Sequence, residues 1–293
     1  MGMKQYDAPA DLAAALDKTD YIADDGLATA AFLALRMGRP LFLEGDAGVG
    51  KTALAQALAT VLDATLIRLQ CYEGIDASQA LYDWDFARQM LHLRAAEADE
   101  NAQREEVEQE LYGRRFLIAR PLLQALETTP SVLLIDELDR ADDEFEAFLL
   151  EVLAESSVTI PELGTIKATT PPLTVITSNR TREVHDALKR RCLYHWVSHP
   201  SFDREVEIIR RRLPEVSELL SRQVARAVGT LRQADLLKPP GVAEAIDWAQ
   251  ALHLLGVREL SPENAARSLG TVLKYREDAE RVLAGDLDTL LGG

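Results

Sequence analysis

Cysteine and long apolar runs are what this sequence has least of. Cys71 and Cys192 are its two cysteines in 293 residues, and neither belongs to a CxxC pair. That scarcity excludes a disulfide framework, argues against a zinc site and favours a reduced cytoplasm. The N-terminal residues lack the apolar core of a signal peptide, and no apolar run approaches the length of a membrane span. We therefore expect a cytoplasmic protein without membrane contact.

Positive charge is also scarce. Lysine and arginine number 32 against 48 aspartates and glutamates, which gives a formal net charge of −16. A surface that grips nucleic acid is normally basic, so this balance argues against general nucleic-acid binding, although a net charge averages over local patches. The chain is 47% hydrophobic, enough to bury a full core, and its length fits about two domains.

Residues 41–52 join an apolar run to the pattern G-x-x-x-x-G-K-[ST], and a helix-forming stretch follows. Strand, glycine-rich turn and helix, in this order, are what a phosphate-binding loop requires, whereas a plain glycine turn needs none of them. Lys51 would reach the β- and γ-phosphates of a nucleotide, and the Thr52 hydroxyl would ligate Mg²⁺. The expected nucleotide-binding residues are Gly45, Asp46, Ala47, Gly48, Val49, Gly50, Lys51, Thr52 and Ala53.

Two adjacent carboxylates, Asp136 and Glu137, end a second apolar run that begins at residue 131. Such a run predicts a buried parallel strand that delivers its acids at the carboxyl edge of a sheet. In a nucleotide hydrolase Asp136 would hold Mg²⁺ through its water shell, and Glu137 would act as general base on the attacking water. An acidic pair at a strand exit is common by itself, and the phosphate loop upstream favours the catalytic interpretation.

Three further residues are weaker candidates. Asn179 ends another apolar run, where its amide would position the same water, although a turn asparagine is common there. Arg190 and Arg191 follow Lys189, and either arginine would serve as a finger that acts on a neighbouring subunit's nucleotide. On the run alone a solubilising basic patch is the more economical interpretation. The guanine-reading N/T-K-x-D motif is absent, which favours adenine, and the close pair His195 and His199 is interpreted as structural.

The hydrophobic pattern predicts an α/β lobe over residues 1–198 and a helical domain over residues 199–293. Strands are expected at 40–44, 65–70, 131–137 and 173–178, a hairpin at 158–170, and helices at 21–37, 51–62, 202–213, 215–232, 240–255, 261–283 and 286–291. Residues 71–113 differ because they contain Trp84, a charged run from 94 to 110 and few strand signals. We expect an exposed helix or helical hairpin there, with a solvated acidic face.

The ordered set of residues 45–52, 133–137, 177–179 and 188–191, followed by helices, resembles the AAA+ ATPases and specifically their MoxR-like branch. Within that branch, the stretches Cys-Tyr-Glu-Gly at 71–74, Leu-Tyr-Asp-Trp at 81–84 and Val-Leu-Lys-Tyr at 272–275 are similar to one subgroup. That subgroup includes the accessory ATPase encoded with molybdenum-containing carbon monoxide dehydrogenase and related hydroxylases. The resemblance covers nearly the whole chain.

The resemblance implies a role for each matched segment. Walker A falls on residues 45–52, Walker B on 133–137, sensor 1 on Asn179, the helix-2 insertion on 71–113 and the pre-sensor hairpin on 158–170. The finger falls best on Arg191, with Arg190 beside it, and Tyr21 and Ile22 fall where the family lines the adenine pocket. The family often carries a sensor 2 arginine near the start of a lid helix. Residues 241–244 and 261–263 offer glutamate instead, so sensor 2 has no position in this sequence.

The family implies ATP and Mg²⁺, a hexameric ring with ATP at subunit interfaces, and a von Willebrand factor A domain partner that helps to remodel or insert metal into a metalloenzyme client. A site completed by a neighbour's arginine supports a ring independently, because such heterologous contacts close on themselves. The rival hypotheses are a nucleotide-gated scaffold with little turnover, a DNA-linked AAA+ motor, and, more distantly, a P-loop metabolite kinase.

Overall fold

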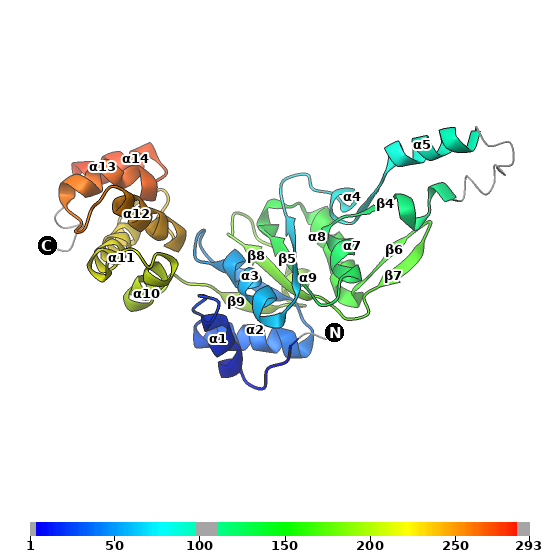
Figure 1. The fold of residues 1–293 in the computed structure, drawn as a ribbon, viewed down its shortest axis with the longest axis horizontal. Coiled ribbons are helices and arrows are strands. Elements are labelled where there is room, and N and C mark those ends of the chain that lie inside the picture. The colour runs from blue at the N-terminus through cyan, green and yellow to red at the C-terminus, as the bar shows by residue number, and fades with distance from the viewer. Residues whose placement is uncertain (1–3, 98–109, 286–293) are drawn as a thin grey trace. The chain divides into compact units, whose positions relative to one another are not determined.

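The computed structural model describes residues 4–97 and 110–285, which form two compact units (Figure 1). The first contains the described parts of residues 1–12, 26–44 and 55–195, and the second contains those of 13–25, 45–54 and 196–293. Helices α1 (Pro9–Asp17), α2 (Asp25–Met37) and α3 (Lys51–Leu62) each contribute residues to both units. Within the described ranges, no helix is long and apolar enough to cross a bilayer.

A five-stranded sheet forms the centre of the first unit, with the strand order β2-β5-β8-β1-β9. The strands are β1 (Leu41–Glu44), β2 (Thr65–Gln70), β5 (Ser131–Asp136), β8 (Leu173–Ser178) and β9 (Leu193–Trp196). The pairs β2–β5, β5–β8 and β1–β8 are parallel, and every residue of β1, β5 and β8 is buried. Continuous apolar runs make such strands because a parallel sheet is covered on both faces. The predicted α/β fold with a parallel sheet is confirmed.

Helices α7 (Pro121–Glu127) and α8 (Asp143–Glu155) pack against this sheet and complete its main core. Asp142 caps α8 by accepting a hydrogen bond from the Phe145 backbone N–H at 2.9 Å. Phe145, Leu149 and Val152 then recur at helical spacing and are buried, and Phe148 beside them is half-buried. The hairpin expected at 158–170 is present as β6 (Ser157–Ile160) and β7 (Gly164–Lys167). Short helical turns complete the unit: η2 (Leu138–Arg140) and α9 (Asp186–Lys189).

The segment after β2 contains more strand than the sequence indicates. It forms α4 (Ala77–Ala80), β3 (Tyr82–Trp84), α5 (Phe86–Glu97), η1 (Arg114–Phe116) and β4 (Leu117–Ala119). β3 and β4 pair in antiparallel register, with Tyr82 opposite Ala119, so the expectation of helices alone is wrong. The exposed helix is confirmed as α5, which projects away from the sheet (Figure 1). Most of the charged run lies in residues 98–109, outside the described residues.

The C-terminal part of the second unit is helical, as expected. Its helices are α10 (Phe202–Arg212), α11 (Glu218–Gln233), α12 (Val242–Leu254), α13 (Pro262–Val272) and α14 (Arg276–Ala284). They share a separate core around Trp248, whose side chain is fully buried and donates a hydrogen bond to the Ser268 hydroxyl at 2.7 Å. The break expected at Pro239-Pro240-Gly241 separates α11 from α12.

Two helix predictions are wrong, one at the start of the helix and the other in its middle. The helix expected at 21–37 begins at Asp25, because the acidic pair Asp24 and Asp25 favours a helix start and leaves residues 21–24 as an irregular segment. The helix expected at 261–283 is divided into α13 and α14. Leu273 is extended and buried in the core, and Asp278 accepts hydrogen bonds from the backbone of the 236–238 loop, which fixes α14 separately. Residues 286–291 lie outside the described residues.

Candidate functional site

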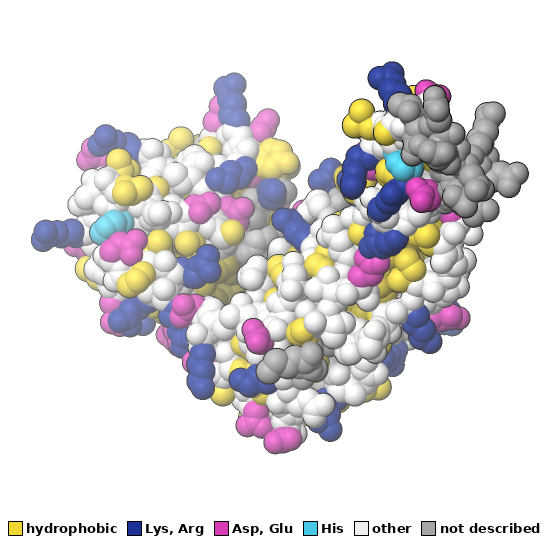
Figure 2. All heavy atoms as spheres, turned by 45° about the vertical axis from the view of Figure 1, so that its right-hand side comes forward, with side chains coloured by type: hydrophobic (Ala, Val, Ile, Leu, Met, Phe, Trp, Pro, Cys, Tyr) yellow, Lys and Arg dark blue, Asp and Glu magenta, His cyan; other side chains and the backbone are white. Residues whose placement is uncertain are grey.

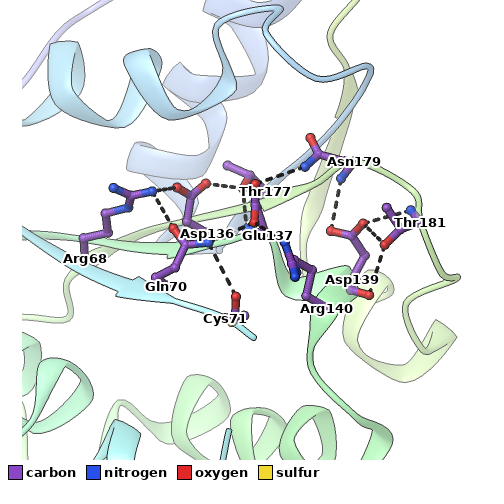
Figure 3. A network of polar contacts seen from close by, with 10 residues as sticks. All are labelled: Arg68, Gln70, Cys71, Asp136, Glu137, Asp139, Arg140, Thr177, Asn179 and Thr181. Carbon is purple, nitrogen blue, oxygen red and sulfur yellow. Dashed lines mark hydrogen bonds and ion pairs between the residues drawn. The ribbon is translucent and has the colours of Figure 1, made fainter. Parts of the chain in front are cut away.

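The carboxyl ends of β5 and β8 bring the first group of predicted residues together. These strands pair in parallel, with Ile135 opposite Ile176, so the residues that follow them emerge at the same edge of the sheet. The Asn179 amide nitrogen lies 3.4 Å from Oε1 of Glu137 (Figure 3). The predicted proximity of Glu137 and Asn179 is therefore found in the structure, although their catalytic roles are not tested by it.

The hydroxyl of Thr177 links the two adjacent acids. It donates to Oδ1 of Asp136 at 2.6 Å and accepts from the backbone N–H of Glu137 at 2.9 Å. Thr177 is itself buried within β8, so this hydroxyl has a fixed position. One threonine therefore sets the orientation of the Asp136 carboxylate and the path of the chain into Glu137. The sequence does not reveal this role, because threonine in a buried strand is unremarkable.

Glu137 adopts a left-handed backbone conformation, with φ of 54° and ψ of 51°. A residue with a side chain holds such a conformation at a cost of order 1–3 kcal/mol, and only where its surroundings impose it. Here the surroundings are Thr177 on the backbone, and Gln70 and Asn179 on the side chain. The Gln70 amide donates to Oε2 of Glu137 at 3.0 Å, so each carboxylate oxygen has an amide donor. The arrangement presents a fixed, partly exposed carboxylate.

Arg68 completes the network from β2. Its guanidinium lies 2.5 Å from Oδ2 of Asp136 and also donates to the Gln70 side-chain oxygen. The second contact orients the Gln70 amide so that its nitrogen faces Glu137. Asp136 itself is 2% exposed and therefore depends on these charge-assisted contacts.

Asp139 is a residue that sequence reasoning missed. Its buried carboxylate accepts hydrogen bonds from the Asn179 backbone N–H at 3.1 Å, the Thr181 backbone N–H at 2.8 Å and the Thr181 hydroxyl at 2.6 Å. These contacts fix the loop that carries Asn179 (Figure 3). The sequence signal was a third acid three residues after Asp136. That signal is weak, because the sequence does not show that this acid contacts the loop from Asn179 to Thr181.

A pocket of about 930 Å³ opens beside this network. Its lining includes Glu73, Glu137, Asp139, Arg140, Asn179 and Thr181. Arg140 lies 3.7 Å from Oε2 of Glu137 but is 57% exposed, so solvent weakens that pair. The volume is ample for water and part of a polar substrate, and the fixed carboxylate of Glu137 faces it.

The phosphate loop belongs to the second unit, directly after β1 in the chain. Gly45, Gly48 and Gly50 all have positive φ, and a Cβ at Gly45 would come within 2.3 Å of the Val197 carbonyl oxygen. Glycine is therefore required at position 45. The Lys51 ammonium is buried and donates to the carbonyls of Gly45 and Asp46, both at 2.7 Å. The loop is thus closed around the lysine that the motif assigns to phosphate binding.

Tyr21 lies against this loop, and Ile22 follows it in the chain. The Tyr21 hydroxyl donates to the Gly50 carbonyl at 3.3 Å, and burial raises the pKa of the phenol. Arg204 of α10 donates to the Ile22 carbonyl. The irregular segment 21–24 is therefore tied to the loop at one end and to α10 at the other, which places an aromatic ring beside the phosphate loop.

The start of α12 meets the phosphate loop where the missing sensor 2 arginine would be sought. The backbone N–H groups of Val242 and Ala243 donate to the Gly48 carbonyl at 3.0 and 3.3 Å. Glu244 accepts from the Gly241 N–H at 2.9 Å and would contact a Cβ at Gly48, also at 2.9 Å. The Glu244 carboxylate therefore lies at this approach to the loop. The backbone N–H groups at the start of α12 supply the partial positive charge there.

Nearby, His199 lies 3.2 Å from the Asp46 carboxylate. Burial lowers the pKa of its imidazole, the charge of Arg232 lowers it further, and Asp46 and Glu244 act in the opposite direction. Arg232 itself forms an ion pair with buried Glu205 at 2.6 Å. His199 therefore contacts the phosphate loop through Asp46.

The two candidate finger residues lie at the end of α9. The Arg190 side chain is 82% exposed, whereas the Arg191 guanidinium donates to the Leu150 carbonyl of α8 at 3.0 Å. Lys189 turns inward, to the buried Glu44 carboxylate at 3.2 Å. Within the described residues, neither arginine forms a hydrogen bond or ion pair with Glu137 of its own chain. Arg190 lies beside exposed Asp186, 3.9 Å away.

Oxygen ligands suit Mg²⁺, and each unit offers one by itself: the Thr52 hydroxyl in the phosphate loop of the second unit, and the Asp136 carboxylate at the end of β5 in the first. Among the residues that the structure describes, no group of three or more His, Cys, Asp or Glu side chains forms a metal cage. A hydroxyl or a carboxylate of this kind suits a cation whose other ligands are water and nucleotide phosphates. Parallel sheet, phosphate loop and acidic strand end together define a P-loop nucleoside triphosphatase.

The chain belongs to the AAA family. Residues 40–192 match the AAA domain of the dynein-related subfamily, and this membership makes the protein an ATPase that uses ATP and Mg²⁺. A 48-residue segment is 48% identical to Midasin of Giardia intestinalis, covering 16% of this chain and 1% of that protein. AAA+ ATPases typically assemble into rings.

Solved structures of Thermotoga maritima RuvB share the fold. A single-residue variant superimposes with a TM-score of 0.50 at 15% identity, covering 98% of this chain and 82% of that one. RuvB described as the Holliday junction branch migration motor gives 0.45 at 16% identity, covering 87% and 67%. At 15% identity, the likeness with a TM-score of 0.50 concerns the fold alone, an α/β core with C-terminal helices.

Proposed function

We propose that this AAA protein is a remodelling or metallochaperone ATPase of the MoxR-like group. It hydrolyses ATP at subunit interfaces and, with a von Willebrand factor A domain partner, matures a metalloenzyme client. The observation that carries the catalytic part is the Glu137 carboxylate, held on both oxygens by Gln70 and Asn179 beside Asp136. A general base needs this kind of fixed orientation towards the water that it deprotonates.

In this mechanism the loop from Gly45 to Ala53 cradles the phosphates, with Lys51 as the counter-charge. Thr52 and, through water, Asp136 would hold Mg²⁺, which would supply positive charge to neutralise the phosphates. Tyr21 and Ile22 line the adenine pocket beside the loop.

Glu137 takes a proton from the attacking water, whose oxygen bonds to the γ-phosphorus as the bond to ADP breaks. Asn179 orients that water, and Arg191 of the next subunit, with Arg190 beside it, stabilises the charge that develops on the transferred phosphoryl group.

We propose that ATP hydrolysis moves a client protein through contacts made by the insertion at residues 71–113 and by the hairpin at 158–170. Phe86, Met90 and Leu91 of α5 are 66%, 54% and 65% exposed. Exposed apolar side chains at helical spacing are a common docking feature. Figure 2 shows apolar side chains next to basic ones on the arm that carries α5. A domain division at residue 198, with a lid over 199–293, is part of the same proposal.

The test is the sedimentation mass of Glu137→Gln with and without ATP and Mg²⁺. We expect a shift from small species to a ring of about six subunits, because bound but unhydrolysed ATP should hold the interface. The same variant should bind ATP normally and turn it over at least about 100-fold more slowly. Normal turnover would overturn the role of Glu137, and a monomer under both conditions would overturn the ring.

Glu244 at the approach to Gly48 favours a second candidate, a nucleotide-gated scaffold with little turnover. A steady-state rate near zero with and without a von Willebrand factor A partner would select the scaffold. The DNA-linked motor predicts salt-dependent DNA binding, which a titration would detect and which the net charge of −16 disfavours.

A further inference from the structure

Arg39 lies between α2 and β1 and directs its guanidinium at the backbone of the finger segment. Its Nη2 donates to the carbonyls of Arg190 at 2.8 Å and Cys192 at 3.2 Å, and its Nε donates to the carbonyl of Arg191 at 3.0 Å. One side chain therefore contacts three consecutive carbonyls, one of them from each candidate finger residue. The two segments are more than 150 residues apart in the sequence, so only the fold brings them together.

These carbonyls need a donor. They belong to residues 190–192, which follow the short helix α9 and precede β9. Outside a helix or sheet, a backbone carbonyl takes its donor from a side chain or from water. A guanidinium suits them because its N–H groups form a rigid fork with a fixed positive charge. A lysine ammonium is a single point on a flexible chain and cannot span the three carbonyls in the same way.

The neighbouring chain reinforces this contact. The Leu193 N–H donates to the Pro40 carbonyl at 2.8 Å, directly after Arg39, where β9 joins β1 in the sheet. The Arg191 side chain meanwhile rests on the Leu150 carbonyl of α8. A pocket of about 370 Å³, lined by Arg39, Leu150 and Arg191 among others, adjoins both contacts. The Arg191 backbone is thus fixed, while its guanidinium has space in which to change partners.

We propose that Arg39 is a positioning residue for the arginine finger: it fixes the backbone of residues 190–192 so that Arg191 reaches the nucleotide of the next subunit. The inference rests on the proposed trans-acting role of Arg191. Arg39 acts through the main chain, since the donors described above are directed at carbonyls. Its loss should therefore damage the neighbour's active site and spare the site in its own subunit.

The experiment measures ATP turnover and ATP affinity in Arg39→Ala, Arg39→Lys and Arg191→Ala, with Arg36→Ala as the matched control. Arg36 is exposed in the last turn of α2, close in sequence to Arg39. We expect kcat to fall about 1000-fold in Arg191→Ala and at least about tenfold in Arg39→Ala, with ATP affinity unchanged in both. Arg39→Lys should restore part of the rate, and Arg36→Ala should behave as wild type.

Mixed rings separate positioning from general damage. Glu137→Gln subunits cannot hydrolyse ATP but carry an intact finger, so adding them to Arg39→Ala subunits should raise the rate per Arg39→Ala subunit severalfold. Adding Arg191→Ala subunits should not, because both types then lack a working finger. A structural defect confined to the mutated subunit would not be rescued by either. Thermal unfolding of each variant checks that the fold is retained.

The outcomes distinguish the two ideas. If Arg191→Ala turns over normally, the finger hypothesis fails and this inference fails with it. Two results would leave the finger hypothesis standing but refute the role of Arg39. In the first, Arg191→Ala is impaired and Arg39→Ala is normal. In the second, Arg191→Ala and Arg39→Ala are both impaired, and Glu137→Gln subunits do not rescue Arg39→Ala subunits. Rescue by Glu137→Gln, without rescue by Arg191→Ala, supports the assignment.

Discussion

The side-chain amide of Gln70 donates a 3.0 Å hydrogen bond to the Glu137 carboxylate, so β2 holds the proposed base, which directly follows the adjacent strand β5. Asn179 of the loop after β8 holds the other oxygen. The base therefore receives its orientation from three neighbouring strands of one sheet. Local sequence around Glu137 contains none of this information.

Removing either amide should slow hydrolysis without weakening nucleotide binding. We expect Gln70→Met, which keeps the chain length but removes the donor, and Asn179→Ala each to lower kcat about tenfold, because the carboxylate loses its orientation. Phosphate release and fluorescent-nucleotide binding measure the two quantities. An unchanged kcat in both variants would show that the amides do not orient the base.

Asp139→Ala should destabilise the first unit and slow turnover together. It leaves the backbone N–H groups of Asn179 and Thr181 without their acceptor, at a cost of about 1–3 kcal/mol in the free energy of unfolding. Urea denaturation measures this change. Asp143→Ala is the control, because that side chain is 81% exposed and its loss should stay within about 0.5 kcal/mol. Equal effects of the two substitutions would contradict the proposed role of Asp139.

Substitutions at Lys51 and Thr52 should affect ATP affinity differently, because one removes a positive charge and the other removes a proposed Mg²⁺ ligand. Lys51→Ala should lose ATP affinity at least about 100-fold with and without Mg²⁺, since it removes the counter-charge from the loop. Thr52→Ala should lose affinity only in the presence of Mg²⁺, because its hydroxyl is the proposed ligand. Calorimetric titration with Mg²⁺ or with a chelator makes the comparison. Wild-type affinity in Lys51→Ala would refute the phosphate-loop assignment.

The two thiols should be inert in the folded protein. Burial raises the pKa of Cys71 to about 12, with added repulsion from Asp136 and other nearby acids, and burial raises the pKa of Cys192 to about 12. Both are therefore thiols rather than reactive thiolates at neutral pH. A colorimetric thiol reagent should react slowly with the native protein and rapidly with two thiols after denaturation. Rapid labelling of the native protein would contradict their burial.

Protonation of His199 should lower the stability of the folded protein as the pH falls into mild acid. The folded state lowers the imidazole pKa below its ordinary value of 6.5, so the folded protein binds the proton less readily than the unfolded chain. The stability is therefore present above that value and is lost as pH falls through it. His199→Gln should flatten the dependence of Tm on pH between about 7.5 and 5.5, whereas exposed His253→Gln should not. Identical pH profiles for wild type and His199→Gln would refute this role.

Local patterns predicted the elements whose signal lies within their own residues. The strands 65–70 and 173–178 and the helix 51–62 are found with the bounds given from sequence, because continuous apolar runs and helical spacing identify them directly. β3 and β4 were missed because each is three residues long and its partner lies far along the chain. The division between α13 and α14 was missed because Asp278 is anchored by a distant loop.

The sequence by itself determined the class of protein. A phosphate loop and an acidic strand end are contiguous segments, and their chemistry depends on residue type and short spacing. Only the tertiary structure decided which side chains support them. Gln70, Asp139 and Arg39 act on partners 67, 40 and 151 residues away, respectively, so their contacts exist only once folding has brought those segments together around the sheet. Hydrogen bonds need atoms within about 3.5 Å, and chain folding alone sets that distance between remote residues.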